Sequence, residues 1–241
     1  GFTFEAAETV CGNFRNPAAE CALSSVEKES SKACASDIDV LDGIASLLNN
    51  SLLVQKEQSD GERRFRMLEV VREYAIELLE ACDEAETLHC HYAAYFLALG
   101  EKADSLLQGA ESDKWLEHLE EEHDNLRNAL QWSLENDTET AARLAAALRF
   151  FWIFHGHLTE GRQWMNTALE RADNLSATVL IKLLNGIGVA ARNQGDYETA
   201  RRMHEIILLD SQSADNVREM TLSIRSLGAI AVRQGDFTEA R

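Results

Sequence analysis

The chain has 241 residues and carries 41 acidic and 23 basic side chains, for a net charge of −18 at pH 7. This excess of acid argues against nonspecific binding to nucleic acids or to anionic membranes, since both depend on clustered lysine and arginine. A single proline and many Ala, Leu and Glu residues favour helices, and the length allows one or two domains. The acid is concentrated in residues 81–135, which hold 13 acidic and 3 basic side chains.

The five cysteines are an odd number and too sparse for a disulfide scaffold, so we expect reduced thiols and a cytoplasmic location. The sequence contains no run of about 18 apolar residues and no signal peptide, so no membrane segment is predicted. The chain starts at Gly1 without a methionine and stops at Arg241, inside a repeat described below. We therefore expect a fragment of a larger protein.

Residues 1–80 are predicted to form a winged-helix-like domain. Apolar side chains recur on one face of residues 39–49, DVLDGIASLLN, which is the pattern of a one-sided helix. Two short strands follow, at 52–54 and 64–68, around the polar turn QSDGE. A helix followed by such a β-hairpin is typical of a winged helix, and this hairpin is the β structure that we expect in a mainly α chain.

Residues 81–136 are predicted to be a helical connector. We expect one helix to end near Cys82, another to cover 86–103, and a long helix to cover 112–136 with a stripe of leucines on one side. Its acidic residues should face water. The acids Glu120 to Glu122 are interpreted as part of this solvated face.

Residues 137–241 contain an internal repeat. The segment 184–201, LNGIGVAARNQGDYETAR, returns as 226–241, SLGAIAVRQGDFTEAR. In both copies a glycine just past a helix end is followed by an aspartate that can cap the next helix. Each unit is therefore predicted to be a helix, a tight turn and a second helix. A related turn begins at Gly156, 39 residues before Gly195.

These units resemble tetratricopeptide repeats, whose period is about 34 residues. The interval between Gly188 and Ala200 returns between Gly228 and Ala240, as in the small-residue pattern of that family. The period of 39 to 40 residues is longer, and Arg149 stands at the glycine site of the first unit. The resemblance implies a TPR-like α-solenoid, in which stacked helix pairs line a concave groove.

Two further segments resemble a family of bacterial regulators. RFRMLEVVREYA (64–75) and LEEEHDNLRNALQW (119–132), together with GFTFEAAETVC and DVLDGIASLLNNSLL, are similar to the C-terminal part of bacterial signal-transducing ATPases with numerous domains, the STAND ATPases. The resemblance implies a winged helix that acts as a regulatory lid on a nucleotide-binding NB-ARC module, followed by repeats that bind a partner. ATP or ADP would then bind in the parent protein, outside this chain.

The chain lacks the pattern G-x-x-x-x-G-K-[ST] of a phosphate-binding loop, so we expect no ATP hydrolysis by this fragment and no cofactor within it. Met67, Leu68 and Glu69 stand where related NB-ARC proteins often carry a Met-His-Asp motif that contacts ADP. The resemblance makes this triplet a weak candidate for nucleotide contact, because leucine cannot donate the hydrogen bond of the histidine. The alternative is that Met67 and Leu68 pack under the wing.

No catalytic or metal site is predicted. His89, Cys90 and His91 include Zn²⁺ ligand types, but consecutive helical residues point about 100° apart and cannot converge on one ion. His118 and His123 are five residues apart, which is not the spacing of a helical metal pair. No Ser/His/Asp or Cys/His set can be assembled from spacing alone. We therefore predict that this chain is not an enzyme, and an enzyme on a repeat scaffold is the least supported class.

A regulatory, non-catalytic function is the main prediction. The repeat groove should bind a protein, a peptide or a small effector, and transmit that state to the nucleotide-binding module of the parent protein. The candidate contacts are exposed positions on the first helices of the repeats, namely Asn185, Arg192, Asn193, Arg225 and Arg233.

The alternative is a DNA-binding transcription factor that uses its winged helix. The wing carries Lys56, Arg63, Arg64 and Arg66, but the helix at 39–49 holds two aspartates and no base. Because a recognition helix enters an anionic groove, this charge disfavours DNA contact. We expect nucleic acid not to be a partner of this fragment.

Overall fold

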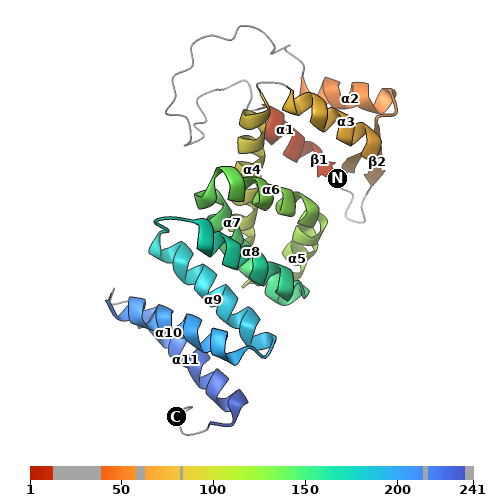
Figure 1. Cartoon of the computed structure of the whole chain (residues 1–241). Helices are drawn as coiled ribbons and strands as arrows, with labels where there is room; N and C mark the ends of the chain where they lie inside the picture. Colours follow the sequence, from red (N-terminus) through yellow and green to blue (C-terminus); the bar gives the residue numbers. More distant parts are fainter. Residues whose placement is uncertain (13–38, 58–62, 82–83, 214–216, 237–241) are drawn as a thin grey trace. The chain divides into compact units, whose positions relative to one another are not determined.

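The computed structural model describes residues 1–12, 39–57, 63–81, 84–213 and 217–236. Over these residues the chain is mainly helical, with one small sheet of three strands (Figure 1). It divides into two compact units. Unit one comprises residues 1–98 and 122–132, and unit two comprises residues 99–121 and 133–241. Within the described ranges, no helix is both long enough and apolar enough to cross a membrane.

The predicted mainly α fold, with a winged-helix unit followed by stacked helices, is confirmed. Unit one holds β1 (Phe2–Thr3), α1 (Phe4–Gly12), α2 (Val40–Asn49), β2 (Leu53–Glu57), β3 (Arg63–Met67) and α3 (Glu69–Glu80). The residues of α4 (Ala85–Leu106) and α6 (His123–Asn136) are divided between the two units. Unit two holds α5 (Ser112–Glu121), α7 (Thr138–His155), α8 (Leu158–Arg171), α9 (Ala177–Asn193), α10 (Tyr197–Ser213) and α11 (Val217–Gln234).

The core of the winged-helix part lies between the sheet and helices α1 and α2. Ile44, Leu53 and Phe65 are buried together, and Met67 packs against them. The strand order is β1-β3-β2, so β1 pairs with β3 on the side opposite β2. We expected a hairpin alone, because a two-residue strand offers no alternation that a sequence pattern could reveal. The third strand is therefore an addition to the predicted fold.

The single long helix predicted over 112–136 is wrong, because the chain breaks at Glu122 into α5 and α6. Glu122 is 3% exposed, and its carboxylate accepts hydrogen bonds from Arg64 and from the Asn125 amide. A buried carboxylate needs such partners, since burial without them is costly. Glu122 is thus not part of a solvated face. Glu120 and Glu121 are exposed, as predicted, and Glu120 also contacts His157.

Unit two contains a stack of helix pairs. Helix α7 packs on α8, α9 packs on both, and α10 packs on α9 and α11. Figure 1 shows these five helices as neighbours in chain order. Gly156 and Gly195 follow α7 and α9 with φ angles of 95° and 82°, a conformation that glycine adopts at little cost. The Asp196 carboxylate accepts a hydrogen bond from the Thr199 N–H at 3.1 Å, so the predicted glycine–aspartate turn is confirmed.

Small residues lie where the helices of a pair come closest. A Cβ atom on Gly161 would lie 2.4 Å from the indole of Trp152, and one on Gly188 would lie 2.9 Å from Nε2 of His204. Ala200, which matches Gly161 in the repeat pattern, is also fully buried. The first helix pair therefore requires an even smaller side chain at this position than the second, because the bulky Trp152 faces it.

We expect Gly161→Ala to destabilise unit two by about 1–3 kcal/mol, because the added methyl group overpacks a tight contact. Trp152 is 1% exposed, so its indole has little room to move away. Urea unfolding followed by tryptophan fluorescence measures the effect. Gly12→Ala is the control, since a Cβ there would meet only the flexible Glu8 side chain at 3.8 Å. Wild-type stability in Gly161→Ala would contradict the tight contact.

Some predictions concern residues outside the described ranges, among them the hairpin turn at 58–62, Cys82 and Ala240. The domain boundaries at 80 and 136 stay predictions. The two compact units divide the expected connector, 81–136, between them.

Candidate functional site

Helix α2 occupies the position of a recognition helix, directly before the hairpin. It begins after Asp39, whose carboxylate accepts a hydrogen bond from a backbone N–H of the first turn at 2.9 Å. Ile44 faces the core, while Asp42, Ser46 and Asn49 are exposed. The exposed face can offer a hydroxyl and an amide to a base edge, but its first turn is acidic.

The hairpin β2–β3 carries basic side chains on the face away from the core. Lys56 pairs with Arg64 across the two strands, and Arg66 follows two residues later. Since alternate residues of a strand share a face, these three side chains lie on one side of the sheet. Lys56 and Arg66 are exposed, as is Arg63 on the opposite face. Exposed bases on a wing are suited to contacts with phosphate groups.

Arg64 differs from the other wing bases because it is only 8% exposed. Its guanidinium forms an ion pair with Glu122 and donates a hydrogen bond to the Gly1 carbonyl oxygen at 3.0 Å. Both charges are largely removed from water, which is tolerated only when each has good partners. Arg64 is therefore part of the buried structure of unit one, and three of the four basic side chains of the wing remain exposed.

The triplet considered for nucleotide contact lies at the junction of β3 and α3. Met67 packs against the core cluster, whereas Leu68 is 54% exposed and precedes α3 without a side-chain cap. Glu69 forms an exposed ion pair with Arg72 at 3.2 Å. The packing alternative therefore describes Met67 and not Leu68. Nucleotide contact by these residues stays a prediction.

The five residues predicted to bind a partner lie on α9 and α11. Asn185 and Arg192 are partly buried in α9, whereas Asn193, Arg225 and Arg233 are exposed. All five belong to first helices of the predicted helix pairs. Their role in binding stays a prediction.

Tertiary folding also joins side chains that sequence spacing did not connect. In unit two, one cluster consists of Glu120, His155 and His157. In another, the buried pair Asp104 and Arg149 is joined by the partly exposed Lys182. Glu120 and His157 are 37 residues apart in the sequence, and Asp104 and Lys182 are 78 residues apart. No local sequence pattern could therefore reveal either cluster. The one sequence feature that could have indicated the first cluster is the pair of histidines on either side of Gly156. His89, Cys90 and His91 form no metal-ligand cluster with other described residues.

Comparison with known proteins defines the class of this unit. Residues 19–80 match the family model of the winged helix-turn-helix domain, so the chain contains such a domain. An alignment of 144 residues, which covers 57% of this chain, is 40% identical to a protein of Mycobacterium bovis named "Putative HTH-type transcriptional regulator". Proteins with the same designation from two strains of Mycobacterium tuberculosis match equally. The chain spans 16% of the length of these relatives. No solved structure matches it.

The predicted winged helix and the similarity to transcriptional regulators are thereby confirmed. The relatives favour the DNA-binding alternative over the main prediction of a sensor fragment, and they run against the expectation that nucleic acid is not a partner. The comparisons do not extend to tetratricopeptide repeats or to an NB-ARC ATPase. Those two assignments stay predictions.

Proposed function

We propose that this chain is part of a transcriptional regulator, in which the winged helix-turn-helix unit contacts DNA and the stacked helix pairs bind a regulatory partner. The observation that carries the proposal is the match of residues 19–80 in a chain whose relatives are named as transcriptional regulators. The proposal includes a cytoplasmic, non-enzymatic role for these residues. Any ATP or ADP would bind to another part of the parent protein.

Exposed groups of α2 and the wing would share the contacts to DNA. Lys56, Arg63 and Arg66 are exposed and would contact phosphates, which position a domain on the duplex. Ser46 and Asn49 are also exposed and would meet base edges with a hydroxyl and an amide. Because the first turn of α2 is acidic, contact is expected through its C-terminal half. Three basic side chains support only a moderate, salt-dependent affinity for DNA.

DNA contact is tested by selecting duplexes from a randomised library with the 241-residue chain, followed by fluorescence anisotropy. We expect the selected duplex to bind about 10³-fold more tightly than a scrambled one. Lys56→Gln and Arg66→Gln should each reduce the slope of log K against log salt by about 1. Arg202→Gln, which removes an exposed arginine from α10, is the control and should change neither quantity. Equal binding to selected and scrambled duplexes would refute sequence-specific recognition.

A second candidate is a regulatory unit that does not contact DNA. The observation in its favour is that Asp39 and Asp42 lie at the N-terminal end of α2. A recognition helix usually contacts base edges with its N-terminal residues, and two carboxylates there would repel DNA. In this version the helix pairs would act as tetratricopeptide-like repeats and bind a protein, a peptide or a small effector. Arg225 and Arg233, exposed on α11, would then contribute to binding. This candidate predicts no selective duplex binding in the same experiment.

A further inference from the structure

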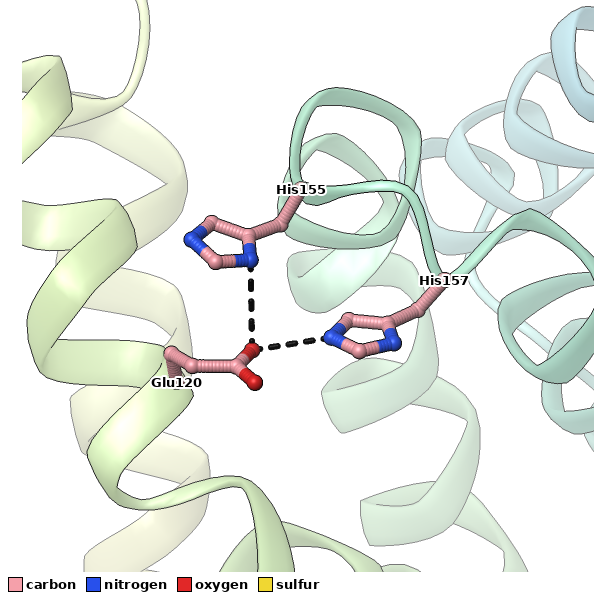
Figure 2. A group of neighbouring side chains, drawn as sticks. All are labelled: Glu120, His155 and His157. Carbon is pink, nitrogen blue, oxygen red and sulfur yellow. Dashed lines mark hydrogen bonds and ion pairs between the residues drawn. The ribbon is translucent and has the colours of Figure 1, made fainter.

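Two histidines and a glutamate meet at the corner between α7 and α8 (Figure 2). Glu120 comes from the end of α5, His155 is the last residue of α7, and His157 directly precedes α8. Oε2 of Glu120 lies 3.3 Å from Nδ1 of His155 and 2.8 Å from Nε2 of His157. We propose that these three side chains bind a divalent transition-metal ion of the Zn²⁺ class.

The glycine between the two histidines makes this convergence possible. On a continuous helix, side chains two residues apart point about 200° apart and would diverge. Gly156 instead ends the helix with a φ of 95°, and the two imidazole rings stack with centroids 5.9 Å apart and planes 15° apart. The buried ring of Phe151 lies 5.6 Å from each imidazole. Packing therefore holds both rings near their positions before any ion binds.

The donor atoms are spaced for one small ion. All three ligand atoms lie within 4.8 Å of one another. With tetrahedral angles and metal bonds of about 2.0–2.1 Å, ligand atoms lie roughly 3.3 Å apart, so small side-chain rotations would complete the geometry. Two imidazoles and one carboxylate are one of the donor sets found in zinc sites with three protein ligands. Imidazole nitrogen also favours such ions over Mg²⁺ and Ca²⁺, which prefer oxygen.

The cluster is accessible from solvent. The exposed fractions of the side chains are 41% for Glu120, 33% for His155 and 28% for His157. A hydrated ion can therefore enter, and water can fill the fourth position. A bound ion would tie the end of α5 to the α7–α8 corner, and ligands that bind only the folded form stabilise it. This inference does not depend on the proposed function.

Zn²⁺ itself is the probe, titrated into the reduced 241-residue chain by isothermal calorimetry. We expect one ion per chain at this site. The double variant His155→Ala/His157→Ala should bind that ion at least about 100-fold more weakly, and Glu120→Gln at least about tenfold more weakly. His118→Ala is the matched control, because it removes a partly buried imidazole from the same helix as Glu120. It should leave this affinity unchanged.

Thermal unfolding provides an independent readout. Zn²⁺ should raise the unfolding midpoint of the wild type and of His118→Ala, but not that of the double variant. Circular dichroism establishes that each variant is folded, and Glu120→Gln, which keeps the size of the side chain, carries the test if the histidine variants unfold. Equal Zn²⁺ affinity in the wild type and Glu120→Gln, or no binding at millimolar Zn²⁺, would overturn the proposal. The cluster would then be a hydrogen-bonded group without a metal.

Discussion

Asp104→Ala is expected to destabilise unit two by about 3–5 kcal/mol, the usual result of removing one partner from a buried ion pair. Oxygens of Asp104 lie 2.7 Å from Nη1 of Arg149 and 2.7 Å from Nζ of Lys182. The side chains of Asp104 and Arg149 are both 8% exposed. The contact to Arg149 is an ion pair outside hydrogen-bond geometry, and Arg149 donates instead to the Ala146 carbonyl at 2.8 Å. Without Asp104, the guanidinium would remain charged where little water reaches it.

Urea unfolding of the variants measures this loss. Glu101→Ala is a matched control, because Glu101 joins the same two helices through Arg143 at 2.8 Å, but with side chains 44% and 40% exposed. An exposed pair contributes about 0–1 kcal/mol. The double variant Asp104→Leu/Arg149→Met should recover much of the stability, since it removes both buried charges. If Asp104→Ala cost no more than Glu101→Ala, the buried cluster would not stabilise unit two.

Acidification is expected to destabilise unit two through His204. This residue is fully buried, and burial, helped by the charge of Arg192, lowers its pKa to about 4. The unfolded chain has an ordinary histidine pKa of about 6.5. Between these two values the unfolded state binds more protons, so the free energy of unfolding falls as the pH falls through that window. The contribution of His204 is fully retained above pH of about 6.5 and decreases by about 3 kcal/mol toward pH 4.

The test is to measure the free energy of unfolding of the wild type and of His204→Leu from about pH 7.5 to about pH 4, which spans the titration of this histidine. Leucine cannot take up a proton. As the pH falls through this window, the free energy of unfolding of the variant should therefore decrease by up to about 1.4 kcal/mol less per pH unit than that of the wild type. Gly12→Ala, which changes no titratable group, serves as the control and should keep the wild-type dependence. Parallel pH profiles for the wild type and His204→Leu would show that His204 is not buried as a neutral imidazole.

The sequence by itself determined the elements whose chemistry is local. The turn at Gly195 and Asp196 depends on a positive φ and on a cap three residues away, and both are readable from neighbouring residues. The hairpin and α2 follow from short patterns of apolar residues. For the same reason the strand β1 was missed, because two residues carry no pattern. Its pairing with β3 depends on a partner more than sixty residues away.

Only the tertiary structure decided which charged side chains leave water. Glu122 and Arg64 are 58 residues apart in the chain, yet they pair at the break between α5 and α6, and this pairing withdraws one basic side chain from the exposed surface of the wing. The metal-ligand cluster around Glu120 and the buried cluster around Asp104 arise in the same way. The sequence does not distinguish a carboxylate that faces solvent from one that contacts an imidazole or a guanidinium. Its energy depends on distance and local dielectric, which the packing of remote segments sets.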